Sequence, residues 1–274
     1  MATRTGIWGL LGGYALISVT PLLWLALAPS KTTGELSSLP PLAFGSFENY
    51  LVAWNQILAY QDGRFLQWAG NSAWYTPVIV LLASSSAMLA GFALAHSAMP
   101  LKRFFLVATF MGVLVPPTAI VLPVFVEISA LGLVNTPWAL ILTGSLFPFG
   151  TLLSYLYFSS ALPRELVESA TIDGAGLWST FARIALPLSS GLIGILFFFS
   201  FTGTWLNFYL PYVLAWQGDV LPIHVGIGLM ARGGALSRPA LALAGLITAL
   251  PVLIVFFASA RMLSRGVFAG ALKT

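Results

Sequence analysis

The sequence has no cysteine and very little charge, and each shortage excludes a class of protein. Without cysteine, disulfides, thiolate catalysis and cysteine-ligated metals are excluded. Charged side chains make up 7% of the 274 residues, whereas soluble domains carry about 25%. Because 58% of the residues are hydrophobic, the chain cannot keep its surface hydrated. An ordinary soluble protein and a disordered one are therefore both excluded.

The few charged residues divide the chain into long apolar runs. A membrane-spanning helix needs about 20 apolar residues, and six runs reach that length. The predicted spans are residues 6–28, 71–96, 104–126, 137–160, 188–212 and 239–261. The sequence therefore predicts an all-α membrane protein in which residues 1–274 form a single transmembrane domain of six helices.

The first run has features of a signal peptide, because Arg4 precedes it and Ala26-Leu27-Ala28 ends it. Its apolar length exceeds the roughly 7–15 residues of a secretory signal, so we expect a retained helix. Six spans place both termini on one side of the membrane. With the termini in the cytoplasm, eight of the 12 basic residues fall in cytoplasmic segments, which the positive-inside rule favours. This cytoplasmic set is Arg4, Lys102, Arg103, Arg164, Arg183, Arg261, Arg265 and Lys273.

Motifs for catalysis and for energy conversion are missing. No lysine stands in a Gly-Lys-Ser/Thr phosphate loop, and there is no His-Glu-x-x-His pair. The two histidines, His96 and His224, fall on opposite predicted sides. Glu127 lies at the outer end of the third run, so the spans lack the mid-membrane charges of ion-driven transporters. We expect a protein that is not an enzyme, with no metal site, and a partner that supplies the energy for any uphill transport.

The connection of residues 161–187 has the pattern of a short cytoplasmic helix-turn-helix. Pro163 suits a first helical position, Glu165 suits a first turn, and Gly174 suits a helix end. A second short helix is expected from about Trp178. These residues alone leave two roles open, which are docking to another protein and resting on the bilayer.

The same connection resembles the EAA loop of ABC importer permeases. The resemblance rests on Glu168-Ser169-Ala170, on Asp173-Gly174-Ala175 and on Ile184-Ala185-Leu186-Pro187. Further stretches, in the right order, are similar to carbohydrate-uptake permeases of the maltose type. They are Asn71-Ser72, Val115-Pro116-Pro117 with Leu131 to Thr136, Thr204 to Pro211, and Arg265 to Lys273. The departures are Ser169 in place of a usual Ala, Gly191 in place of a common Pro, and one residue inserted between Trp205 and Asn207.

The resemblance implies the type I ABC importer permease fold, with a coupling helix between spans four and five. It implies that this helix sits in a groove on an ATPase subunit, where the coupling residues are Glu168, Ser169, Ala170, Asp173, Gly174 and Ala175. The implied partners are a homologous second permease, an ATPase dimer and an extracellular solute-binding protein. ATP and Mg²⁺ would bind the ATPase, and this chain would carry no cofactor. The implied location is a prokaryotic cytoplasmic membrane.

Breaks in the apolar runs indicate a candidate substrate path, because transporter sites lie where spanning helices are interrupted. Pro116 and Pro117 interrupt the third run, and Trp205, Asn207 and Tyr209 precede Pro211 in the fifth. Aromatic faces and an amide suit a sugar, although the same side chains also suit helix packing or interfacial anchoring.

The outer segment near residues 218–237 carries the candidate contacts for a binding protein. They are Met230, Arg232, Gly233 and Gly234. A plain flexible loop is the alternative for this segment.

Two other functions stay open at the level of sequence. One is an ABC permease for another solute, such as a polyamine or a glycerol phosphodiester. The other is a membrane-embedded enzyme acting on lipid, which would need a cluster of polar catalytic groups at one depth.

Overall fold

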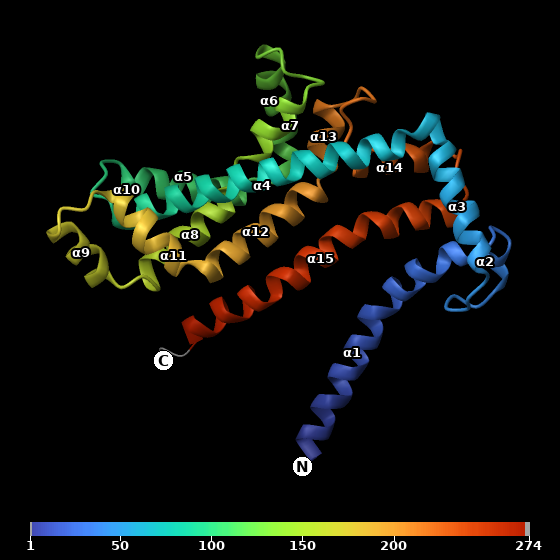
Figure 1. The fold of residues 1–274 in the computed structure, drawn as a ribbon, viewed down its shortest axis with the longest axis horizontal. Coiled ribbons are helices and arrows are strands. Elements are labelled where there is room, and N and C mark those ends of the chain that lie inside the picture. The colour runs from blue at the N-terminus through green and yellow to red at the C-terminus, as the bar shows by residue number, and fades with distance from the viewer. Residues whose placement is uncertain (1, 272–274) are drawn as a thin grey trace. The chain divides into compact units, whose positions relative to one another are not determined.

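The computed structural model describes residues 2–271, and within that range the chain consists of helices joined by turns and short connections (Figure 1). The chain divides into two compact units. The first contains residues 1–69 and 223–251, and the second contains residues 70–222 and 252–274. Two long helices, α4 (Arg64–His96) and α15 (Arg238–Ala271), run from one unit into the other.

The first unit joins the N-terminal helix to a structured connection. Its helices are α1 (Ala2–Leu27), α2 (Glu35–Ser38), α3 (Phe47–Ala59), the start of α4, α14 (Ile223–Arg232) and the first part of α15. The Lys31 side chain is buried and its Nζ donates to the carbonyls of Pro40 and Pro41, at 2.8 and 2.9 Å. These bonds satisfy the buried charge and close the connection on itself.

A capping box starts α2. The Thr32 N–H donates to Glu35 Oε2 at 2.8 Å, and the Glu35 N–H donates to Thr32 Oγ1 at 3.2 Å. The backbone hydrogen bond from Thr32 lowers the pKa of the Glu35 carboxyl. The predicted outer loop after the first span therefore has its own helices rather than irregular structure.

The second unit packs short helices against the long α4. They are α5 (Lys102–Leu114), α6 (Pro117–Ala130), α7 (Pro137–Gly144), α8 (Pro148–Ser160), α9 (Arg164–Ile172), α10 (Leu177–Thr180), α11 (Leu186–Leu188), α12 (Ser190–Trp205) and α13 (Tyr209–Leu214). Figure 1 shows α5, α8 and α12 beside one another, while α6, α7 and α13 form a second group. Two apolar clusters underlie these groups.

Within residues 2–271, four helical segments are long and apolar enough to cross a membrane. They are Gly6–Ser30, Phe47–His96, Pro137–Ser160 and Arg238–Ala260. Two bent pairs bring the number to as many as six, because α5 with α6 bends by 109° and α10 to α11 with α12 bends by 85°. Pro116 and Pro117 explain the first bend, since proline removes a backbone donor and clashes with the preceding turn. The membrane boundaries of the six spans stay a prediction.

Two local structures differ from the simplest sequence expectation. The segment after α10 is a π-helical turn at Phe181–Ala185, rather than a continuation of an α-helix. The outer segment near residues 218–237 contains the regular helix α14 and is not a plain loop. Part of the C-terminal resemblance, residues 272–273, lies outside the described residues.

Candidate functional site

A cavity of about 300 Å³ lies in the second unit, where several helices break. Its walls come from α4, from the starts of α6 and α13, from α7 and from the end of α12. Pro117 is the first residue of α6 and follows a bend, and residues 206–208 form a non-helical break between α12 and α13. Non-helical backbone at membrane depth is tolerated where it lines such a cavity.

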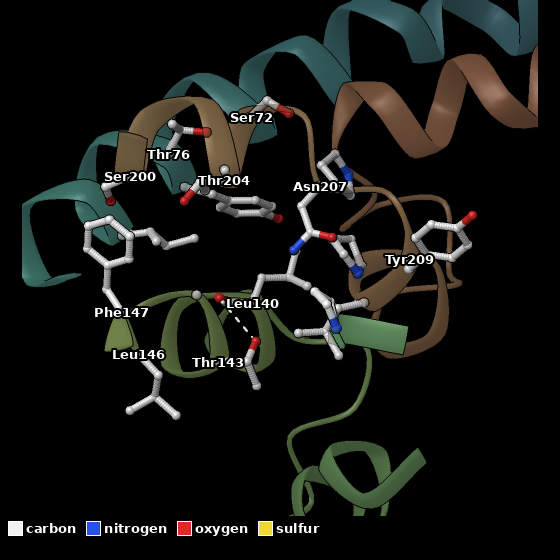
Figure 2. Close-up of a pocket in the computed structure, with 18 of the residues that line it drawn as sticks. Ser72, Thr76, Leu140, Thr143, Leu146, Phe147, Ser200, Thr204, Asn207 and Tyr209 are labelled. Atoms are coloured by element: carbon white, nitrogen blue, oxygen red, sulfur yellow. Dashed lines mark hydrogen bonds between the residues drawn. The ribbon is translucent and has the colours of Figure 1, made fainter. Parts of the chain in front are cut away.

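Hydroxyl groups, one amide and aromatic rings give the cavity its chemistry. Figure 2 shows Ser72, Thr76, Ser200 and Thr204 on one side and Leu140 with Thr143 on the other. Asn207 lies between these two sides. The described lining residues include no Asp, Glu, Lys or Arg. The cavity therefore offers neutral hydrogen-bonding groups and apolar faces.

Some of these hydroxyls are already engaged with their own helix. Thr143 Oγ1 donates to the carbonyl of Ala139 at 2.7 Å. Its oxygen can still accept a second bond, because a hydroxyl has two lone pairs. Tyr75 lines the cavity from α4 and its hydroxyl donates to the carbonyl of Val220 at 3.2 Å.

The structure brings together three of the predicted path residues. Pro117, Asn207 and Tyr209 all line the cavity. Pro116 precedes α6 as its cap and is not among the lining residues. Trp205 is 9% exposed and stacks on Phe201, with ring centroids 5.6 Å apart and planes 9° apart. This position matches the packing alternative that the sequence left open for Trp205.

Sequence reasoning missed the Ser and Thr lining residues on α4 and α12. Thr76 follows Ser72 by four residues on α4, and Thr204 follows Ser200 by four on α12. Residues four apart share a helix face. Paired small polar residues at this spacing within apolar spans were the available signal.

The second candidate element is α9 with the turn that follows it. The Ala175 N–H donates to the Ala170 carbonyl at 2.9 Å, and the Gly174 N–H donates to Thr171 at 3.0 Å. These two bonds and the φ of +80° at Gly174 form a Schellman cap. The sequence prediction placed the end of the helix at this glycine.

The exposed residues of α9 differ in part from the predicted coupling set. Glu168, Ser169, Asp173 and Gly174 are exposed, whereas Ala170 is buried and Ala175 is half-buried. Two apolar side chains that the sequence analysis did not assign to docking are strongly exposed near them. They are Ile172 at 86% and Trp178 at 68%. An exposed apolar patch of this kind suits either of the two roles that the sequence left open, docking to another protein or resting on the bilayer.

Aromatic packing joins this element to the spans. Phe181 in the π-helical turn packs on Phe92 of α4 and on Phe158 of α8, with centroids 5.3 and 6.5 Å apart. Ala185 and Leu162 belong to the same buried cluster. A displacement of α9 to α11 would therefore press on α4 and α8 through close-packed rings.

The predicted binding-protein contacts lie at the end of α14. Met230 is fully buried in the first unit, while Arg232, Gly233 and Gly234 are exposed. Gly234 has a φ of +62°, which suits the turn after the helix.

Apolar spans broken around an uncharged polar cavity, with a capped and exposed helix between two spans, define a multi-pass membrane permease. Residues 87–269 match the family described as "Binding-protein-dependent transport system inner membrane component". The chain belongs to this family and is a membrane permease subunit of a binding-protein-dependent importer. The resemblance to ABC importer permeases is thereby confirmed.

Curated relatives extend over nearly the whole chain. A diacetylchitobiose uptake system permease, NgcG of Streptomyces coelicolor, is 29% identical over 266 residues, covering 95% of this chain and 86% of the relative. An arabinooligosaccharide transport permease, AraQ of Halalkalibacterium halodurans, is 27% identical and covers 94% and 92%. A galactooligosaccharide transport permease, GanQ of Bacillus subtilis, is 30% identical and covers 96% and 93%. These relatives are transport proteins and not lipid enzymes.

A solved structure confirms the fold class. The chain matches a chain in the crystal structure of a bacterial ABC transporter involved in the import of the acidic polysaccharide alginate. The TM-score is 0.79 at 18% identity, and the match covers 94% of this chain and 96% of the other. The all-α type I importer permease fold predicted from sequence is therefore correct.

Proposed function

We propose that this chain forms half of the translocation path of an ATP-driven importer for a neutral sugar or oligosaccharide. The cavity carries the proposal, because its hydroxyls, its single amide and its aromatic rings match the hydrogen-bonding and apolar faces of sugars. The relatives named for oligosaccharide uptake support the same substrate class.

The cavity also bears on the two other solutes that the sequence left open. A polyamine or a glycerol phosphodiester would bring charge into a space whose described lining includes no opposite charge. Moving an unpaired charge out of water is costly. The half of the path that this chain forms therefore favours a neutral solute.

The proposed energy source lies outside this chain. Two ATPase subunits would bind ATP and Mg²⁺, and their closure would push α9 and its turn. The exposed Glu168, Asp173 and Ile172 would contact a groove on the ATPase, in the helix-in-groove mode of recognition. Ala170 and Ala175 would not contact the ATPase, and their small side chains would instead allow α9 to pack closely against α10.

A second permease and a solute-binding protein complete the proposed complex. Arg232, which ends α14, and Gly233 and Gly234, which follow it, are exposed and would meet the binding protein on the outer side. The excess of basic residues in the predicted cytoplasmic segments supports an orientation with both termini inside.

Uptake of labelled solutes by cells that lack this chain, complemented with variants, tests the proposal. We expect Asn207→Ala to lower neutral oligosaccharide uptake by about tenfold, because this change corresponds to the free energy of about one or two hydrogen bonds lost to the solute. The control is Leu206→Ala, because Leu206 is exposed and is not among the lining residues. Restoration of polyamine or phosphodiester uptake without any sugar uptake would contradict the proposal.

A further inference from the structure

The connection after α13 is held by side chains from two separate elements. Residues 214–221 accept hydrogen bonds from Asn71 and Tyr75 on α4, and they donate hydrogen bonds to the side chain of Asn135 in the turn between α6 and α7. We call these three side chains and their bonds the staple. All of its members belong to the second unit.

The α4 side of the staple binds three successive carbonyls. Asn71 Nδ2 donates to the carbonyls of Asp219 and Leu221, at 2.8 and 3.0 Å. The Tyr75 hydroxyl donates to the carbonyl between them, that of Val220, at 3.2 Å. Asn71 and Tyr75 are four residues apart and share a helix face. One face of α4 therefore satisfies the main chain of this connection.

Asn135 forms the other side of the staple through its amide oxygen. Its Oδ1 accepts from the N–H groups of Trp216 and Gln217, at 2.9 and 3.0 Å, and its own N–H donates to Leu214 at 2.8 Å. Asn135 has a φ of +58°, a left-handed conformation in which asparagine is enriched. The backbone and side chain of one residue thus engage three main-chain groups.

The stapled connection lies next to the cavity. Tyr209 and Pro211 line the cavity before it, Pro222 lines the cavity after it, and Tyr75 of the staple lines the cavity from α4. Asn71 is near the start of α4, whereas His96 at its end contacts the Phe158 carbonyl beside the α9 region. At 1.5 Å per residue the two sites are about 38 Å apart along the helix. The staple is therefore at the end of α4 away from α9.

We infer that Asn71, Tyr75 and Asn135 are positioning residues that seal the outer end of the cavity until α9 is displaced. This inference rests on the proposed function, in which the cavity is the translocation path and α9 faces the cytoplasm. The staple joins α4 to the α6–α7 turn across the connection. Loss of its bonds frees the connection and opens the cavity to the outer solution.

The same chemical change has opposite expected effects at the two asparagines. Asn71→Asp removes the amide donor and sets a carboxylate against two carbonyls. Asn135→Asp keeps an oxygen that accepts from two N–H groups, and aspartate also tolerates positive φ. The first variant should open the seal and the second should keep it closed.

The measurement uses a single reporter cysteine, which is possible because the chain has none of its own. Ser200→Cys places the thiol on the cavity wall, where Ser200 is 5% exposed. A membrane-impermeant maleimide is added to the outside of right-side-out vesicles that contain the assembled importer without its binding protein. We expect Asn71→Asp to raise the labelling rate about tenfold, which corresponds to about 1.4 kcal/mol. Asn135→Asp should leave the rate within twofold.

A milder variant covers the case in which Asn71→Asp does not assemble. Tyr75→Phe keeps the ring in its apolar cluster and removes only the bond to Val220. It should raise the labelling rate by severalfold. The inference is overturned if Asn71→Asp is labelled at the same rate as the reporter chain without it. Where Asn71→Asp does not assemble, the same result for Tyr75→Phe overturns the inference. It is also overturned if Asn135→Asp is labelled as fast as Asn71→Asp.

The labelling result is independent of which solute is transported. Faster labelling of Asn71→Asp, together with no sugar uptake by the unaltered chain, would contradict the proposed substrate but not the inference about the seal. Normal sugar uptake with unchanged labelling would contradict the seal alone.

Discussion

At Gly174 the main chain takes a φ of +80°, and a Cβ added there would meet no heavy atom within 4 Å. Space is therefore available for a side chain, and the requirement for glycine comes from the backbone conformation alone. Residues with a Cβ pay about 1–2 kcal/mol in the left-handed region, and asparagine pays less than most. The Schellman cap that ends α9 depends on this one conformation.

Gly174→Ala should therefore loosen the end of α9 and weaken its proposed contact with the ATPase. We expect solute uptake to fall about fivefold while ATP hydrolysis continues, so that more ATP is used per solute imported. Parallel assays of uptake and hydrolysis in reconstituted importer would measure this ratio. Gly174→Asn is the matched control, because it adds a larger side chain that tolerates the same φ. Equal ratios for the Ala and Asn variants would refute the backbone explanation.

Individual residues differ in how far the sequence predicts their place. The place of Gly174 at the end of α9 was predictable, because a glycine that follows an amphipathic helix commonly adopts the positive φ that ends it. Trp205 was ambiguous, because an aromatic ring in an apolar span suits a sugar and a neighbouring ring equally, and here it stacks on Phe201. Thr76 and Ser200 are not informative singly, since serine and threonine in helices often bond only to the preceding turn, and only their spacing of four residues from Ser72 and Thr204 indicates a shared polar face.

At the scale of helices, the close approach of α4 and α8 depends on Gly91. A Cβ at Gly91 would overlap the Ser154 side chain and would lie 2.6 Å from the backbone nitrogen of Tyr155. Small residues let membrane helices approach closely, and van der Waals packing then stabilises the pair. The pair also carries Phe92 and Phe158, which pack on Phe181, so the spacing of α4 and α8 bears on the proposed coupling as well as on stability.

Gly91→Ala should push α4 and α8 apart and destabilise the assembled importer by about 1–3 kcal/mol. Thermal unfolding of the purified complex, followed through its midpoint, would detect the loss. Gly9→Ala on α1 is the control, because a Cβ there meets nothing within 4 Å. Adding Ser154→Gly to Gly91→Ala should recover part of the loss, and a wild-type midpoint for Gly91→Ala alone would show that the contact is not tight.

Breaks within helices were only partly predictable. The bend between α5 and α6 follows from Pro116-Pro117 and was visible in the sequence. The break between α12 and α13 falls at residues 206–208, within the Trp205 to Tyr209 stretch that the sequence indicated ahead of Pro211. The π-helical turn at Phe181–Ala185 has no such signal in the sequence, because it depends on packing with helices distant in the chain, which local propensity does not contain.

At the scale of the whole molecule, composition determines the environment. The side chains of α1 from Ile7 to Trp24 include many large exposed apolar groups, which water would not tolerate over such an area. The number of apolar runs, the fold class and the family were all predictable from sequence. The division into two compact units was not, because it depends on which faces pack together.

The proposed orientation places both termini in the cytoplasm and can be measured directly. A reporter enzyme active only outside the cytoplasm should be active when inserted at Gly34 and inactive when inserted at Gly176. Both sites are open, because a Cβ at either glycine would meet nothing within 4 Å. The reverse pattern of activity would overturn the orientation, and activity at both sites would contradict an odd number of spans between them.

The helix α4 is continuous over 33 residues and carries a staple residue near one end and His96 at the other. If α4 moves as a rigid body, a displacement that changes the contacts at one end of the helix also changes the contacts at the other end. Equilibrium coupling between two sites is reciprocal. If ATPase docking lowers the free energy needed to open the seal, then opening the seal strengthens ATPase docking by the same free energy. If the proposed orientation and partner are correct, a permease with a weakened staple should therefore bind the nucleotide-loaded ATPase more tightly, although the altered residue lies on the opposite side of the membrane from it.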